Sequence, residues 1–261
     1  METTINRLNK LLKLKSRAVL SVFFTAGFPH IDDTVTIAAA LQDAGVDLIE
    51  IGIPFSDPVA DGPVIQDSNT VAIHNGMTLK KLLEQVKKIR ETVTMPIVMM
   101  GYLNPVMQYG VEAFCRDFSA AGADGVILPD MPMDVYQKEY RGIFEKYGLK
   151  NVFLISPTTS TERIRLIDEV TDGFIYAVSS SSTTGAKNAF SEEQHAYFTR
   201  LKELSLKNPF LIGFGVSSRE TFSKVCEYGA GAIVGSAFIS MLKTSKNLKE
   251  DIHKFVKDIN N

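Results

Sequence analysis

Apolar, β-branched runs bounded by turn residues recur eight times along the chain. Most of these runs are continuously apolar, a pattern typical of parallel strands that are buried on both faces. We therefore predict eight strands, at Val19–Thr25, Asp47–Ile53, Ile97–Gly101, Gly125–Leu128, Asn151–Ile155, Gly173–Val178, Phe210–Gly213 and Ala232–Val234.

Amphipathic stretches at helical spacing separate the strands, and the clearest are Asp32–Ala44, Leu79–Thr92, Val111–Ala121 and Glu192–Leu206. Eight alternating strand–helix units predict the α/β fold class and a (β/α)8 TIM barrel, with residues 1–261 as a single domain. An open doubly wound sheet is the alternative, but no Gly-x-Gly-x-x-Gly motif follows the first predicted strand.

One extra helix is predicted before the barrel, because Ile5, Leu8, Leu11 and Leu12 recur at helical spacing. A short helix that covers apolar surface is favoured over a transit peptide. The N-terminus lacks an apolar signal region, and no segment approaches the length of a membrane span. We therefore expect a cytoplasmic protein.

Composition narrows the class of protein further. The formal net charge is -2, whereas a nucleic-acid-binding surface normally brings an excess of basic residues. Cys115 and Cys226 are far apart and show no metal-ligand spacing, so we expect reduced thiols. These features favour an ordinary globular enzyme that binds neither nucleic acid nor a membrane.

The second predicted strand carries a carboxylate, Glu50, and runs directly into an acidic, Pro-rich loop with Asp57 and Asp61. Strand residues alternate in direction, so Glu50 points away from the face formed by the isoleucines 49, 51 and 53. Burial of a carboxylate raises its pKa towards the range useful for proton transfer. A structural glutamate that caps a helix or pairs with an arginine is the alternative.

In a barrel of this type the active site lies at the carboxyl ends of the strands. No predicted strand ends in a lysine, which disfavours a Schiff-base aldolase. The four histidines are scattered, so no metal site is predicted. Carboxylates and hydrogen bonds remain as the means of catalysis.

A phosphate site is predicted after the last two strands. Gly215 begins one loop, and Gly235 and Ser236 open a helical run after the other. Glycine lets backbone N–H groups approach phosphate oxygens, and the dipole of a helix N-terminus favours an anion. The polar loop after the sixth strand offers Thr184 and Gly185 as further contacts, although a plain surface loop remains an alternative.

With these residues in place, the chain resembles the tryptophan synthase alpha subunit family along nearly its whole length. The stretch Leu48–Gln66 resembles the family signature. Three shorter matches support it, namely Thr25-Ala26-Gly27-x-Pro29, Gly213-Phe214-Gly215-Val216 and Gly235-Ser236-Ala237. The resemblance implies cleavage of indole-3-glycerol phosphate to indole and D-glyceraldehyde 3-phosphate. Indole then passes to a beta subunit, which holds pyridoxal phosphate, within an alpha2-beta2 complex; no cofactor is implied for this chain.

The resemblance also implies roles for single residues. Glu50 is implied as the general acid/base and Asp61 as the carboxylate that binds the indole N–H. The implied substrate contacts are Phe23, Tyr176 and Phe214 around indole and Thr184, Gly185, Gly215, Gly235 and Ser236 around phosphate. The implied interface with the beta subunit includes Pro54, Asp57, Asn104 and Pro132. One departure is Ser182 and Thr183, where the family usually has a glycine and a branched apolar residue.

Three alternative functions stay open at this point. A free-standing indole-3-glycerol phosphate lyase would need no partner. A subunit that mainly activates its partner would not need Glu50 and Asp61. Another barrel enzyme acting on a phosphorylated substrate, such as a sugar-phosphate isomerase, would share the phosphate site but not an aromatic-lined pocket beside Asp61.

Overall fold

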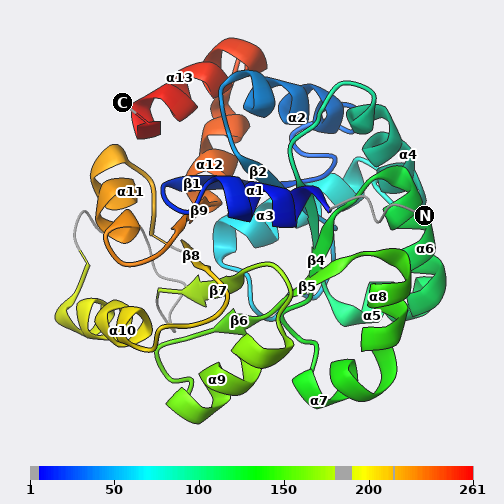
Figure 1. The fold of residues 1–261 in the computed structure, drawn as a ribbon. Coiled ribbons are helices and arrows are strands. Elements are labelled where there is room, and N and C mark those ends of the chain that lie inside the picture. The colour runs from blue at the N-terminus through cyan, green and yellow to red at the C-terminus, as the bar shows by residue number, and fades with distance from the viewer. Residues whose placement is uncertain (1–5, 180–189, 214, 261) are drawn as a thin grey trace.

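The computed structural model describes residues 6–179, 190–213 and 215–260, and its strands form one parallel sheet that curves into a barrel (Figure 1). The strands follow one another in the order β5-β4-β3-β2-β1-β9-β8-β7-β6. Their bounds are β1 Val19–Thr25, β2 Leu48–Gly52, β3 Ile97–Met100, β4 Gly125–Ile127, β5 Lys150–Val152, β6 Leu154–Ile155, β7 Ile175–Val178, β8 Phe210–Gly213 and β9 Gly231–Val234.

The fifth predicted strand differs from expectation, because Asn151–Ile155 is divided at Phe153 into β5 and β6. The chain changes its partner there: β5 pairs with β4, and β6 pairs with β7. The backbone N–H of Tyr176 donates to the carbonyl of Phe153 across the junction, at 2.9 Å. The two ends of the sheet therefore adjoin at a single residue, and the predicted barrel architecture is confirmed.

Helices surround the barrel in a ring (Figure 1). Their bounds are α1 Arg7–Leu14, α2 Asp33–Asp43, α3 Pro63–His74, α4 Leu79–Arg90, α5 Leu103–Tyr109, α6 Val111–Ala121, α7 Met133–Val135, the π-helical turn η1 Tyr136–Tyr140, α8 Arg141–Tyr147, α9 Thr161–Val170, α10 Glu192–Glu203, α11 Arg219–Cys226, α12 Ser236–Thr244 and α13 Leu248–Asn260. The predicted helix at 111–121 has its predicted bounds, whereas the other three end one to three residues earlier than predicted. Helix termini are the least certain part of any pattern-based prediction.

Alternation along β2 divides the apolar residues into two layers. Ile49 and Ile51 point outward into the core between strands and helices. Leu48 points inward and packs with the other side chains that fill the barrel. Because Glu50 alternates with these isoleucines, its side chain enters the barrel interior, as predicted.

Helix α1 crosses the amino-terminal end of the barrel and lies across the middle of the ring in Figure 1. Leu8 is fully buried in the inner cluster, and Leu11 and Leu12 pack against it. The prediction of a helix that covers apolar surface is confirmed for these three residues, while Ile5 lies outside the described residues. Asp47 fixes the end of α1, because it accepts the N–H of Leu20 at 2.8 Å and pairs with Lys15.

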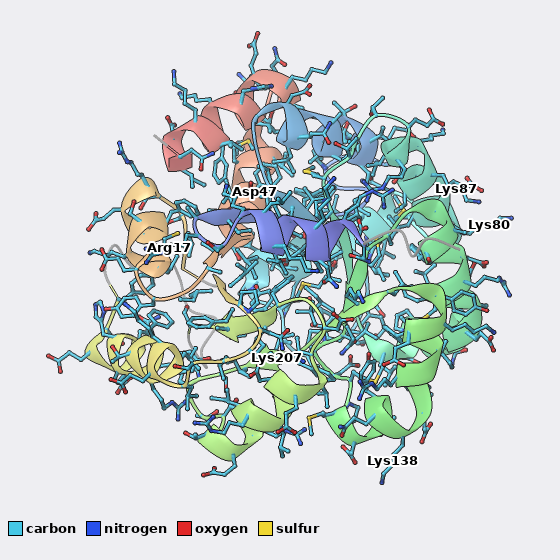
Figure 2. The ribbon with its side chains drawn as sticks, viewed as in Figure 1. Arg17, Asp47, Lys80, Lys87, Lys138 and Lys207 are labelled. Carbon is cyan, nitrogen blue, oxygen red and sulfur yellow. The ribbon has the colours of Figure 1, made fainter. Side chains whose placement is uncertain are left out.

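Charged side chains point away from the barrel axis along the outer ring. Figure 2 shows Lys80, Lys87 and Lys138 extending from the rim, and all three are exposed. Among the described residues, no helix is long and apolar enough to cross a membrane. Cys115 and Cys226 are free thiols, as expected.

Candidate active site

Glu50 is fully buried on the inner face of β2, between two apolar neighbours. The strand register places it beside Phe23 of β1 and Val98 of β3. The hydroxyl of Ser21 donates to its Oε1 at 2.8 Å, whereas Oε2 has no hydrogen-bond partner among the described residues. One oxygen of the buried carboxyl group is therefore hydrogen-bonded, whereas the other is buried without a partner.

Burial changes the acidity of this group. Loss of hydration raises the pKa of Glu50 to about 8, and the hydrogen bond from Ser21 lowers it by a smaller amount. A carboxyl group with this pKa is largely protonated at neutral pH and can serve as a general acid. The rise in pKa predicted from the strand pattern is confirmed.

Asp61 lies on the loop between β2 and α3, at the carboxyl end of the barrel. Tyr102 hydrogen-bonds to its carboxylate, and the Nδ2 of Asn69 donates to Oδ2 over a long 3.5 Å. The Tyr102 hydroxyl also accepts the backbone N–H of Ala60 at 3.0 Å. Burial raises the pKa of Asp61, while the hydrogen bonds from Tyr102 and Asn69 act in the opposite direction.

Tyr176 on β7 is within electrostatic range of both carboxylates. Its ring belongs to the inner cluster, together with Phe174, and Val178 packs against this cluster. Burial raises the pKa of the Tyr176 hydroxyl well above its usual value, and the charges of Glu50 and Asp61 add to the effect. The phenol of Tyr176 therefore stays neutral and interacts electrostatically with both acidic groups.

Phe23 provides an apolar wall beside this cluster. A β-carbon on Gly52 would lie 2.7 Å from the Phe23 ring, and one on Gly235 would lie 3.6 Å from it. Gly52 therefore leaves the room that the ring occupies, whereas a β-carbon on Gly235 would only contact the ring. The structure brings Phe23, Glu50 and Gly235 together, although they come from three different strands or strand ends.

The helix start at Gly235 suits an anion better than the one after β8. Gly235 is the N-cap of α12, no side chain caps the helix, and its first turn contains no acidic residue. At α11, by contrast, the N–H groups of Ser217 and Ser218 already donate to Thr221. Gly215 has a φ of +79° and open space at its β-carbon position. Ser236 is exposed at the first residue of α12.

Three predicted substrate contacts, Thr184, Gly185 and Phe214, lie outside the described residues. The described flanks of the segment 180–189 are tied together by Gln194 of α10. Its Nε2 donates to the carbonyl of Ser179 at 3.0 Å, and its Oε1 accepts the N–H of Ser191 at 2.9 Å. The end of β7 and the start of α10 are thus joined by one side chain.

The four predicted interface residues lie after β2, β3 and β4, at the same end of the barrel as Asp61. Asp57, Asn104 and Pro132 are exposed, and Pro54 is half-buried. Pro54 lines a hollow of about 370 Å³ whose other lining residues come largely from the start of α4 and from α5. Nearby Val59 and Met107 expose 83% and 53% of their surface, an unusual amount for apolar side chains.

Three residues of the site were missing from the sequence-based assignment of roles: Ser21, Asn69 and Tyr102. Ser21 is a polar residue within an apolar strand and lies two positions from Phe23. This spacing places both side chains on the same face of the strand and could have indicated that Ser21 points into the site. The sequence pattern could not identify Asn69 as a site residue, because its burial depends on how α3 packs. No group of three or more metal-ligating side chains occurs among the described residues.

The family model for the tryptophan synthase alpha chain matches residues 9–260. A tryptophan synthase alpha chain from Flavobacterium johnsoniae is 54% identical over 255 residues, which cover 98% of this chain and 100% of that protein. The chain belongs to the tryptophan synthase alpha chain family.

Solved structures agree with the family assignment. Tryptophan synthase from Mycobacterium tuberculosis superposes with a TM-score of 0.88 at 32% identity, covering 97% of this chain and 96% of that one. Tryptophan synthase subunit alpha from Legionella pneumophila superposes with a TM-score of 0.87 at 34% identity, covering 98% of this chain and 97% of that one. Membership of the tryptophan synthase alpha chain family confirms the predicted enzyme class, a lyase of tryptophan biosynthesis.

Proposed function

We propose that Glu50 and Asp61 carry out the cleavage of indole-3-glycerol phosphate to indole and D-glyceraldehyde 3-phosphate. The observation that carries this proposal is the state of Glu50. It is fully buried at the site, has one oxygen without a partner and has a pKa of about 8. Such a group can donate a proton at neutral pH and take one back.

In the proposed reaction, protonated Glu50 transfers its proton to the ring carbon of indole that bears the glycerol chain. Asp61 accepts a hydrogen bond from the indole N–H and stabilises the positive charge that develops on the ring. The Glu50 carboxylate then takes the proton of the adjacent chain hydroxyl. As the carbon–carbon bond breaks, its electron pair restores the aromatic ring and the hydroxyl carbon becomes the aldehyde.

The remaining predicted residues bind the substrate in this proposal. Phe23 and Tyr176 contact the indole ring, together with Phe214. The uncapped start of α12 at Gly235 and Ser236 binds the phosphate. Contacts from Gly215, Thr184 and Gly185 complete the phosphate site.

We further propose that the chain works in the cytoplasm with a tryptophan synthase beta subunit, in an alpha2-beta2 complex. Pyridoxal phosphate would belong to the beta subunit, and this chain would need no cofactor. The exposed apolar residues Val59 and Met107, beside Pro54, Asp57 and Asn104, support docking at the carboxyl end of the barrel. Docking there would bring the partner to the opening through which indole leaves.

The test is indole release from indole-3-glycerol phosphate by the purified chain, with and without a beta subunit. We expect slow release that rises sharply with the partner and disappears in Glu50→Gln. Glu84→Gln is the matched control, because Glu84 is exposed on α4. Fast release without a partner would identify a free-standing lyase, whereas no release in either condition would overturn the proposed function. If Glu50→Gln still activates the beta subunit, activation and cleavage are separate tasks of the chain.

A further inference from the structure

Ser21 is the hydroxyl residue that meets the Glu50 carboxyl group inside the barrel. Its Oγ donates to Oε1 at 2.8 Å, and both side chains are fully buried. Strand β1 is otherwise apolar from Val19 to Phe24, and the burial of a hydroxyl there is favourable only with a hydrogen-bond partner. Each residue therefore satisfies a polar group of the other.

The strand register determines which oxygen the serine reaches. Phe23 pairs with Glu50, and Ser21 pairs with Leu48, so Ser21 lies two residue pairs closer to the amino-terminal floor of the barrel, on the same face as Phe23. The hydroxyl therefore approaches Glu50 from the floor side and binds Oε1. The other oxygen, Oε2, is the atom without a partner among the described residues.

We propose that Ser21 is a positioning residue: it occupies Oε1 of Glu50 and thereby makes Oε2 the oxygen that carries and transfers the catalytic proton. The inference rests on the proposed role of Glu50. It adds a specific atom and a specific partner to that role.

The other groups around Glu50 are compatible with this assignment. On the neighbouring strands, Phe23 and Val98 carry no titratable group. From β7, Tyr176 interacts electrostatically with Glu50, and its hydroxyl stays neutral because its pKa is raised well above the usual value. Asp61 interacts with the same tyrosine from the loop after β2. Among residues 6–179, 190–213 and 215–260, Ser21 is the group whose hydrogen bond favours the ionised form of Glu50.

This arrangement accounts for every proton in the proposed reaction. In the neutral acid, Oε2 bears the proton and Oε1 is a carbonyl oxygen that accepts from Ser21. Transfer of the Oε2 proton to the indole ring carbon leaves a carboxylate, which Ser21 continues to stabilise through Oε1. The proton of the chain hydroxyl then returns to Oε2 as the carbon–carbon bond breaks. Ser21 never exchanges its own proton and acts through Glu50 alone.

The experiment combines infrared spectroscopy of Glu50 with kinetics in Ser21 variants. The carbonyl band of protonated Glu50 is assigned as the band that disappears in Glu50→Gln. Ser21→Ala should move this band to higher frequency, because the carbonyl loses its hydrogen bond. The pH at which the band disappears should rise by about one unit, the size expected for one lost hydrogen bond to a charged group. The alkaline fall of kcat/KM should move to higher pH by the same amount.

Matched variants separate the hydroxyl from its volume. Ser21→Thr keeps a donor, and Ser21→Val has nearly the same shape without one. Threonine should retain the parent band and pH profile, whereas valine should behave like alanine, with kcat lowered about tenfold and KM changed less than twofold. Ser245→Ala is the distant control, because the Ser245 hydroxyl donates to Asp251 in the first turn of α13, away from the site. It should change neither the band nor the kinetics.

The outcomes distinguish this inference from the proposed function. If folded Ser21→Ala and Ser21→Val keep the parent band position and pH profile while Glu50→Gln is inactive, the role of Ser21 is wrong and that of Glu50 stands. If the parent protein releases no indole, the proposed function fails, and a band shift in Ser21→Ala still establishes the contact with Glu50. Thermal unfolding of every variant identifies a substitution that fails to fold.

Discussion

The hydroxyl of Tyr176 occupies the space that a β-carbon on Gly213 would need. The two residues lie on neighbouring strands, β7 and β8, and the tyrosine hydroxyl approaches the glycine backbone too closely for any side chain. Gly213 therefore determines where Tyr176 stands relative to Glu50 and Asp61. Absence of a side chain, not backbone flexibility, is the property that this position requires.

Gly213→Ala should displace Tyr176 and lower kcat/KM by about tenfold to a hundredfold, the range expected for a small misplacement of substrate or catalytic groups. Gly142→Ala is the matched control, because a β-carbon on Gly142 meets no atom within 4 Å and the residue is in helix α8. The control should be neutral or slightly stabilising. Steady-state kinetics of both variants checks the prediction. Equal activity would show that catalysis does not depend on the position that Tyr176 occupies in the structure.

Glu50 makes stability depend on pH. Its pKa rises from 4.5 to about 8 on folding, so the folded protein retains a proton that the unfolded chain releases between these values. Stability therefore falls as pH rises across this window, and the full loss is present above about pH 8. Glu50→Gln removes the penalty and keeps an acceptor for Ser21.

We expect the free energy of unfolding of Glu50→Gln to equal that of the parent near pH 4.5 and to exceed it at pH 9 by on the order of a few kcal/mol. Urea unfolding at both pH values measures the difference. Glu84→Gln, at an exposed position, should follow the parent at both. If the difference in unfolding free energy between Glu50→Gln and the parent does not change with pH, Glu50 does not titrate in this window.

Asp61 and Asp57 lie on the same loop, but we expect their substitutions to have different effects. Asp61→Asn keeps an oxygen for the indole N–H but removes the charge that stabilises the cationic ring, so kcat should fall by about 10²–10³. Asp57→Asn changes an exposed residue and should leave the isolated chain unaffected while weakening the response to the beta subunit. Rates of indole release with increasing partner concentration separate the two effects. An equal loss in both variants without the partner would remove the distinction between catalytic and interface residues.

The sequence was sufficient for the barrel and for the inward direction of Glu50, because both depend on alternation within single strands. It was insufficient for the contact between Ser21 and Glu50. These residues are 29 positions apart, and their contact depends on the register between β1 and β2, which a residue pattern does not contain. The hydrogen bond from Tyr102 to Asp61 likewise depends on how two loops approach each other.

The division of the fifth strand at Phe153 was missed for a related reason. The residues from 150 to 155 keep their alternation throughout, with Val152 and Leu154 inward and Phe153 outward. A change of partner strand leaves no trace in such a pattern. Closure of the barrel is a property of the whole sheet, whereas the pattern reports one strand at a time.

Asp124 supports the floor of the barrel, on the opposite side from the site. It is 2% exposed and pairs with Arg90 at 2.9 Å and with Arg7 of α1 at 3.1 Å. It also accepts the N–H of Ile97 at 2.9 Å, which fixes the start of β3. Burial lowers the pKa of Arg90 to about 10, which indicates that this cation depends on its partner.

Asp124→Ala should lower the free energy of unfolding by about 3–5 kcal/mol, because it leaves Arg90 buried without its counter-charge. Asp172→Ala is the matched control. Asp172 also pairs with a cation, Lys150, but its side chain is 56% exposed, so its loss should cost less than about 1 kcal/mol. Urea unfolding of both variants measures the contrast. Near-equal losses would show that the Asp124 cluster contributes no more than a surface ion pair and that α1 is held to the barrel by Leu8 and its apolar neighbours instead.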